Sequence, residues 1–283
     1  MNSRSIVLVI AGSDSSGGAG LVRDVQVLSQ FEVDARCVVT AVTAQTNSYV
    51  AAVHHLSPQL VRQQMQAALE AGGIGAVKIG MLGTHAIVEA VIESLPPRDR
   101  IPIVLDPVLA SSSGGSLLEA AAMPVMQESL IPRVTLITPN VLEAAVLLGG
   151  EAAMNEATMI EHAQRILCIG PQAVLLKGGH ATGEQAVDVL VTSTAAPTRF
   201  HAPRINVTLR GTGCALSSAI AASLALGMPL IEACDRAKRF VYRQLQQAGG
   251  DVPTLDRIQQ PGTSTIEPAE YPTVRRPPQH SGQ

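Results

Sequence analysis

The chain has 283 residues, of which 46% are hydrophobic, 15% are charged and 2% are aromatic, and its formal net charge is -3. This length suffices for one large α/β domain with a sizeable core. A near-neutral charge with so few aromatic side chains argues against a nucleic-acid-binding surface, which usually needs a basic face and stacking platforms. We therefore expect a small-molecule partner and no nucleic acid.

The cysteines and the apolar segments indicate the compartment. Cys37, Cys168, Cys214 and Cys234 form no C-x-x-C pair, so the sequence predicts neither a zinc site nor a disulfide framework. The apolar run at residues 6–11 is too short for a signal peptide, and no stretch is long enough to span a bilayer. We expect a protein of the reducing cytoplasm that makes no membrane contact.

The chain opens with a predicted strand, a glycine-rich loop and a helix. Residues 6–11 are a mostly β-branched run, typical of a strand buried on both faces of a parallel sheet. The loop at 12–20 matches neither G-x-G-x-x-G nor the P-loop motif, and it leads into helical apolar spacing at 21–28. Ligands of such sheets gather where loops leave the strands. Asp24 is therefore either a ligand contact or a solvated charge.

Strands and helices then alternate. Further strands are predicted at residues 37–44, 76–82, 101–105, 134–138 and 173–176, and an edge pair at 186–191 and 199–205. Helices are predicted at residues 58–71, 84–95, around Glu143, 215–226 and 229–248. This alternation predicts a doubly wound sheet in one domain at residues 1–248. The Pro-rich residues 249–283 are predicted to form a poorly ordered tail.

The predicted strand ends carry polar side chains suited to ligands. The Gln45 carboxamide can read donors and acceptors on a heterocycle. Asp106, followed by proline, suits a metal or a phosphate-bound water. Lys177, beside two glycines, suits a polyphosphate, although a turn with a solvated lysine has the same pattern. Asn140 and Glu143 are either further ligands or an N-cap with its capping-box partner.

The segment Arg210-Gly211-Thr212-Gly213-Cys214 precedes an apolar helix. Its glycines let a ligand approach the backbone, and the amides of a helix N-terminus favour an anion. The segment therefore predicts a phosphate cradle beside a thiol, whereas a tight turn with a core cysteine is the alternative. Because a helix N-terminus lowers the pKa of a thiol, we expect Cys214 to accept a proton during catalysis.

Together these segments resemble the ribokinase-like kinases, and within them closely the hydroxymethylpyrimidine/phosphomethylpyrimidine kinases of the thiamine pathway. The matching segments are residues 10–14, 16–20, 43–45, 78–82, 105–108, 138–140 with Glu143, 176–180 and 211–214. They occur in order from residue 6 to about residue 245. The resemblance implies a three-layer α/β/α ribokinase-like fold with a central, mostly parallel sheet.

The resemblance also implies roles for individual residues. Binding of the aminopyrimidine would fall to Gly12, Asp24, Gln45, Met81 and Val108. The catalytic residues would be Gly211, Gly213, Cys214 and Lys177. Lys177, Arg210 and Thr212 would contact ATP, and Asp106, Asn140 and Glu143 would hold Mg²⁺ through water. Such a site transfers a phosphoryl group by positioning and electrostatics, and the relatives commonly form homodimers.

The chain departs from the family pattern in three places. Arg210 stands where histidine is usual, no lysine occurs near Ser112, and the Pro-rich tail replaces a histidine-rich segment. We expect a kinase that uses Mg-ATP on 4-amino-5-hydroxymethyl-2-methylpyrimidine and then on its monophosphate. A pyridoxal or pyridoxine kinase is the nearest alternative, although residues 110–115 lack the second cysteine of such relatives. A second alternative is a non-catalytic protein that binds a pyrimidine phosphate.

Overall fold

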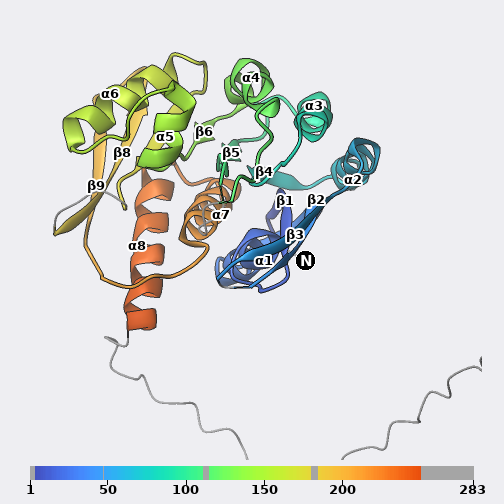
Figure 1. Cartoon of the computed structure of the whole chain (residues 1–283), viewed down its shortest axis with the longest axis horizontal. Helices are drawn as coiled ribbons and strands as arrows, with labels where there is room; N and C mark the ends of the chain where they lie inside the picture. The colour runs from blue at the N-terminus through green and yellow to red at the C-terminus, as the bar shows by residue number, and fades with distance from the viewer. Residues whose placement is uncertain (1–3, 47, 111–114, 180–183, 250–283) are drawn as a thin grey trace, which may run out of the picture. The chain divides into compact units, whose positions relative to one another are not determined.

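The computed structural model describes residues 4–46, 48–110, 115–179 and 184–249, which form a nine-stranded sheet with helices on both faces (Figure 1). Ser112 and most of the tail predicted at residues 249–283 lie outside the described residues. Among the residues described, no helix combines the length and the apolar character needed to cross a bilayer.

The central sheet has the strand order β3-β2-β1-β4-β5-β6-β7-β8-β9. The strands are β1 Ile6–Asp14, β2 Asp34–Gln45, β3 Val50–His55, β4 Ile74–Ile79, β5 Ile103–Leu105, β6 Leu136–Ile137, β7 Ala173–Lys177, β8 Gln185–Thr192 and β9 Thr198–Pro203. The strands from β2 through β7 in this order pair in parallel, whereas β3, β8 and β9 pair antiparallel. The predicted mostly parallel sheet is confirmed, and the predicted edge pair is antiparallel.

Helices form a layer on each face of the sheet. They are α1 Gly20–Gln30, α2 Pro58–Glu70, α3 His85–Ser94, α4 Ala122–Val125, α5 Val141–Leu148, α6 Glu156–Leu167, α7 Thr212–Ala225 and α8 Leu230–Gly249, with a π turn at Met126–Leu130 and a 3₁₀ turn at Ile131–Arg133 after α4. Helices α1, α7 and α8 cover one face, and α2 to α6 cover the other (Figure 1). The expected three-layer arrangement is confirmed.

Strand β1 shows why a continuous apolar run suits the centre of this sheet. Leu8 and Ile10 pack into the core beneath α2 and α3, while Val7 and Val9 pack into the core beneath α1 and α7. All four side chains are fully buried. Burying each contributes about 1.5–3 kcal/mol, so both helical layers are anchored to the same strand.

Local sequence signals set several helix starts. The Ser57 hydroxyl accepts from the Leu60 amide at 3.2 Å, and the Thr84 hydroxyl accepts from the Ile87 amide at 3.3 Å. These are the caps predicted for α2 and α3. No prediction covers strand β3, helix α6, or the short helical turns from α4 to Arg133.

The strand order has its topological switch point at β1. The chain passes from β1 to β2 on one side and continues to β4 on the other, so the connections diverge between β1 and β4. Ligands of open α/β sheets bind beyond the carboxyl ends of the strands at such a point. The predicted site residues follow strand ends along this edge, which sets the place of the candidate site.

Candidate active site

The glycine-rich loop and the start of α7 meet through backbone atoms. Gly20 and Gly211 have φ angles of +59° and +71°, a region that glycine adopts readily. A Cβ atom at Gly20 would collide with the Gly12 carbonyl oxygen, and one at Gly211 would collide with the Gly18 carbonyl oxygen. Glycine at both positions therefore lets the loop lie directly against the N-terminus of α7.

Arg210 joins this loop to the end of β2. Its guanidinium donates to the Thr46 carbonyl at 2.7 Å and to the Ser16 hydroxyl at 3.2 Å, and it lies 3.5 Å from the Asp14 carboxylate. Three protein acceptors thus hold the Arg210 guanidinium, which the resemblance assigns to ATP binding. Thr212 begins α7 immediately after it, and no side chain caps that helix. Nucleotide contacts by Arg210 and Thr212 stay predictions.

A charged cluster lies beneath the first turn of α7. The Lys177 Nζ atom is 2.9 Å from Asp106 Oδ1 and 3.8 Å from Glu143 Oε2. A Cβ atom at Gly213 would lie 3.2 Å from the same Nζ atom, so the missing side chain leaves the ammonium close to the helix backbone. The ends of β5, β6 and β7 and the start of α7 therefore converge here.

Electrostatics keep the two central members of this cluster charged. Burial lowers the pKa of Lys177, but the Asp106 and Glu143 carboxylates outweigh burial, and the pKa is raised. Burial raises the pKa of Asp106, but Lys177 and Lys78 together hold that pKa below its usual range. The Asp106 carboxylate is also within 3.2 Å of the Thr138 hydroxyl. The cluster thus presents a permanent ammonium to an anion bound at the helix start.

Asn140 and Glu143 form the capping box of α5. Asn140 Oδ1 accepts from the Leu142 and Glu143 amides at 2.9 Å, and Glu143 Oε2 accepts from the Asn140 amide at 2.7 Å. Burial raises the pKa of Glu143 to about 7, with Lys177 opposing the rise. Within the described ranges, no group of three or more His, Cys, Asp or Glu side chains is arranged to hold a metal ion. Any role with Mg²⁺ through water stays a prediction.

Asp24 is placed differently from the sequence expectation. Its carboxylate has no exposed surface, and it accepts from Lys78 Nζ at 2.7 Å and from the Ser218 hydroxyl at 2.8 Å. Burial lowers the pKa of Lys78, but the Asp24 carboxylate outweighs burial, so the ammonium stays protonated. Because both Asp24 oxygens are occupied inside the protein, the expected direct contact with a ligand is corrected to an internal ion pair.

The expected lowering of the Cys214 pKa is wrong. Cys214 is half-buried in the first turn of α7, and the Gly20 amide donates to its sulfur. Burial raises the pKa of this thiol to about 11, and it outweighs the opposing effects of Lys78 and the Gly20 amide. The helix start therefore places the thiol beside the glycine-rich loop, but the thiol is protonated near neutral pH.

The predicted substrate-binding residues lie at or near strand ends along this edge of the sheet. A Cβ atom at Gly12 would lie 3.0 Å from the Met81 sulfur, so these two residues are neighbours. The backbone of Gln45 is tied to Ser15, whose hydroxyl lies 2.9 Å from the Gln45 amide nitrogen. Val108 is half-buried just beyond Asp106. Their contacts with a ligand stay predictions.

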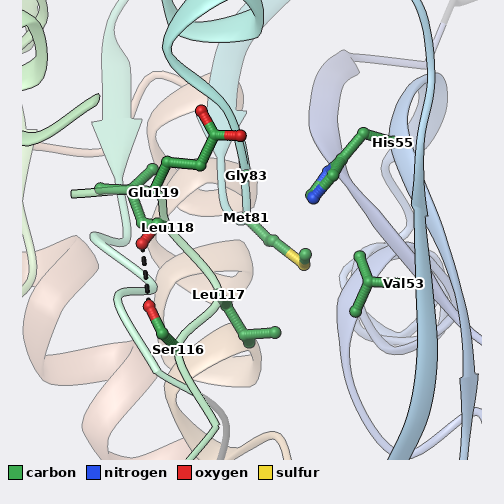
Figure 2. A pocket seen from close by; sticks show the side chains of 8 residues that line it. All are labelled: Val53, His55, Met81, Gly83, Ser116, Leu117, Leu118 and Glu119. Atoms are coloured by element: carbon green, nitrogen blue, oxygen red, sulfur yellow. Dashed lines mark hydrogen bonds between the residues drawn. The ribbon is translucent and has the colours of Figure 1, made fainter. Parts of the chain in front are cut away.

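The structure contains a cleft beside Met81 that no sequence motif predicts. It has a volume of about 180 Å³ and is lined by Val53, His55, Met81, Gly83, Ser116, Leu117, Leu118 and Glu119. Figure 2 shows His55 and Val53 of β3 facing the segment 116–119 across the cleft, with the Met81 side chain between them. Val53 and His55 are two residues apart and so share a strand face. That spacing is the signal that could have found them.

Comparisons with known proteins show what the chain is similar to. The family model described as phosphomethylpyrimidine kinase matches residues 14–254. A hydroxymethylpyrimidine/phosphomethylpyrimidine kinase from Rhizobium meliloti is 40% identical over 245 residues, which are 86% of this chain and 91% of the relative.

Solved structures agree with this result. A crystal structure of phosphomethylpyrimidine kinase from Clostridium difficile has a TM-score of 0.75 and 37% identity, and the match covers 86% of this chain and 100% of that one. An ADP complex of Bacillus subtilis pyridoxal kinase has a TM-score of 0.76 and 32% identity, with 84% of this chain and 90% of that chain covered. With its ribokinase-like fold, this chain belongs to the phosphomethylpyrimidine kinase family.

Proposed function

We propose that this chain transfers the γ-phosphoryl group of ATP to the hydroxymethyl group of 4-amino-5-hydroxymethyl-2-methylpyrimidine, and then a second one to the resulting monophosphate. The family membership supports a kinase of thiamine biosynthesis. The observation that carries the proposal is the Lys177 ammonium close to Gly213 at the uncapped start of α7. Such a site stabilises charge that develops on a transferred phosphoryl group.

The residues present fit a nucleotide polyphosphate and a hydrated magnesium ion. The Gly211 and Gly213 amides and Lys177 would bind phosphate oxygens, with Thr212 at the same helix start. Mg²⁺ usually keeps several waters and binds one or two carboxylates together with substrate phosphates. Asp106 already accepts a hydrogen bond from Lys177, and Glu143 and Asn140 accept hydrogen bonds from backbone amides. These three side chains would therefore hold the ion through water. When bound, the ion neutralises charge on the phosphates.

The two phosphoryl transfers place different demands on Cys214. In the first, the substrate oxygen forms a bond to the γ-phosphorus, the bond to ADP breaks, and the hydroxyl proton must leave. The Cys214 thiolate would accept that proton. In the second, the attacking phosphate oxygen is already ionised, so no proton acceptor is needed. Cys214 therefore acts in the first transfer alone.

The raised pKa gives the first transfer a distinctive pH dependence. Since the thiolate is the active form and the pKa of Cys214 is about 11, its fraction rises as pH increases. We expect kcat for the hydroxymethyl substrate to rise about tenfold per pH unit between about pH 8 and 10, above the Glu143 pKa of about 7. Steady-state kinetics with the monophosphate in parallel should show no such slope.

The matched variants separate the thiol from other effects. Cys214→Ala should lower kcat for the first transfer by roughly 10²–10⁴-fold and remove the pH slope. Cys168→Ala, at an exposed cysteine after α6, is the control. It should keep the wild-type kcat for the first transfer and the wild-type pH slope. A wild-type profile that is flat from pH 8 to 10 would exclude Cys214 as the proton acceptor.

Substrate competition tests the function as a whole. ATP consumption with Mg²⁺ is measured with hydroxymethylpyrimidine, its monophosphate and pyridoxal, and the products are resolved by mass. Formation of the diphosphate from the pyrimidine supports the proposal. Phosphorylation of pyridoxal alone would favour the second candidate, which the similarity to Bacillus subtilis pyridoxal kinase motivates. Binding of the monophosphate without turnover would indicate a non-catalytic binder.

The proposal also covers the oligomeric state and the cellular compartment. We infer a homodimer in the cytoplasm from the resemblance to kinases of this family. Sedimentation of the purified protein measures the assembly directly, and a monomer at micromolar concentration would contradict it.

A further inference from the structure

The cleft between β3 and the segment 116–119 has the size and lining of a site for a single small ring. Its volume of about 180 Å³ is below the roughly 300–1,000 Å³ of pockets that enclose drug-sized ligands. Val53, Met81, Leu117 and Leu118 give it apolar walls (Figure 2). A nucleotide is too large for this space, whereas one end of a methylated heterocycle fits it.

His55 places its imidazole ring on one side of this cleft. Its Nδ1 atom is buried, and it has no hydrogen-bond partner among the residues that the structure describes. The ring packs over Gly83, where φ is +86° and a Cβ atom would collide with the imidazole. Since Nδ1 faces Gly83, Nε2, which lies farther from that Cβ position, is the ring nitrogen left for a ligand in the cleft.

The wall opposite His55 is fixed by the protein itself. The Glu119 amide donates to the Gly83 carbonyl at 2.8 Å, and its carboxylate accepts from the His85 amide at 3.2 Å. The Ser116 hydroxyl donates to the Leu118 carbonyl at 2.8 Å, as the dashed line in Figure 2 shows. These hydrogen bonds therefore fix the segment 116–119 on the side of the cleft that faces β3.

Met81 connects the cleft to the candidate active site. It lines the cleft, and its sulfur lies next to the Cβ position of Gly12 in the glycine-rich loop. The Gly12 carbonyl in turn lies against Gly20, whose amide donates to the Cys214 sulfur. A ring that reached from Cys214 past Gly12 would thus enter the cleft at Met81.

We propose that this cleft receives the 2-methyl end of the pyrimidine substrate and that His55 forms a hydrogen bond with a ring nitrogen beside that methyl group. The inference rests on the proposed function. Carbon 2 lies opposite carbon 5, which carries the reacting hydroxymethyl group, and both ring nitrogens flank carbon 2. The apolar walls suit the methyl group, and the imidazole suits the nitrogen. His55 and Leu117 are thereby specificity-determining residues.

Two variants test the inference in the full-length kinase. His55→Ala should raise KM for hydroxymethylpyrimidine about five- to tenfold, while kcat and KM for ATP stay near wild type, because a ground-state hydrogen bond is lost. His55→Gln keeps a donor and should recover part of the loss. His54→Ala, at the neighbouring exposed position of β3, is the control and should change neither parameter.

A substrate series tests the methyl contact. Hydroxymethylpyrimidines that carry hydrogen, methyl, ethyl or propyl at carbon 2 are compared in wild type and in Leu117→Ala. The enlarged cleft should shift the kcat/KM preference from methyl toward ethyl by about fourfold and toward propyl by about 15-fold, since it buries the one or two added methylenes.

The outcomes separate the inference from the proposed function. Unchanged KM in His55→Ala, together with an unchanged carbon 2 preference in Leu117→Ala, would overturn the inference while the kinase activity stands. If wild type neither binds nor phosphorylates any of the pyrimidines, the proposed function fails and the inference fails with it.

Discussion

Replacing Lys78 with methionine is expected to lower the free energy of unfolding by about 3–5 kcal/mol, the usual cost of removing one partner of a buried ion pair. Lys78 and Asp24 are both fully buried, and their charged atoms are 2.7 Å apart. Methionine fills the space along β4 but leaves the Asp24 carboxylate with the Ser218 hydroxyl as its remaining bonded donor. An uncompensated charge would then stand between β4, α1 and α7.

Thermal unfolding measures this effect. At about 2–4 °C per kcal/mol for domains of 150–250 residues, the melting temperature should fall by roughly 6–20 °C. The double variant Asp24→Asn/Lys78→Met removes both charges, and it should recover most of the lost stability. If Lys78→Met melts at the wild-type temperature, the ion pair contributes nothing and the description of this core is wrong.

Lys177→Met is expected to lower kcat/KM for the pyrimidine by about 10²–10³-fold, the range seen when one donor to a developing charge is removed. The Lys177 ammonium stays protonated because the Asp106 and Glu143 carboxylates raise its pKa. It also lies close to the Gly213 backbone, where the phosphates are proposed to bind. Methionine retains the length of the side chain but carries no charge.

A charge-balanced variant separates catalysis from folding in this second case. Lys177→Met alone leaves Asp106 uncompensated, so part of the loss could come from instability. Asp106→Asn/Lys177→Met restores the balance and should raise the melting temperature above that of the single variant, while kcat/KM stays low. Recovery of activity in the double variant would show that Lys177 acts on stability and not on the phosphoryl group.

Much of the fold could be predicted because its signals are local. Apolar runs such as residues 6–11 and 101–105 identify buried strands, and Ser57 and Thr84 identify helix starts by side-chain chemistry alone. In a parallel sheet the strand ends share one edge, so the positions of Asp106 and Lys177 at strand ends predict that they lie near each other. Strand β3 was missed because its sequence, Val50–His55, is short and only partly buried.

The chemistry of the site was less predictable because it depends on contacts between distant segments. Lys78 interrupts an apolar strand, and its sequence neighbours give no sign that Asp24, 54 positions earlier, neutralises it. The helix start correctly placed Cys214, but the desolvation that raises its pKa comes from the surrounding fold. The cleft unites His55 with Glu119, which lie far apart along the chain and carry no shared motif.

The backbone contacts between Gly12 and Gly20, and between Gly18 and Gly211, constrain attempts to redesign this enzyme. Both contacts involve a main-chain carbonyl, so the obstacle to a larger residue at Gly20 or Gly211 is not a side chain that a second substitution could shorten. Combinatorial libraries that alter substrate choice should therefore keep these two glycines fixed. Diversity is better placed at His55 and Leu117, whose side chains line the cleft.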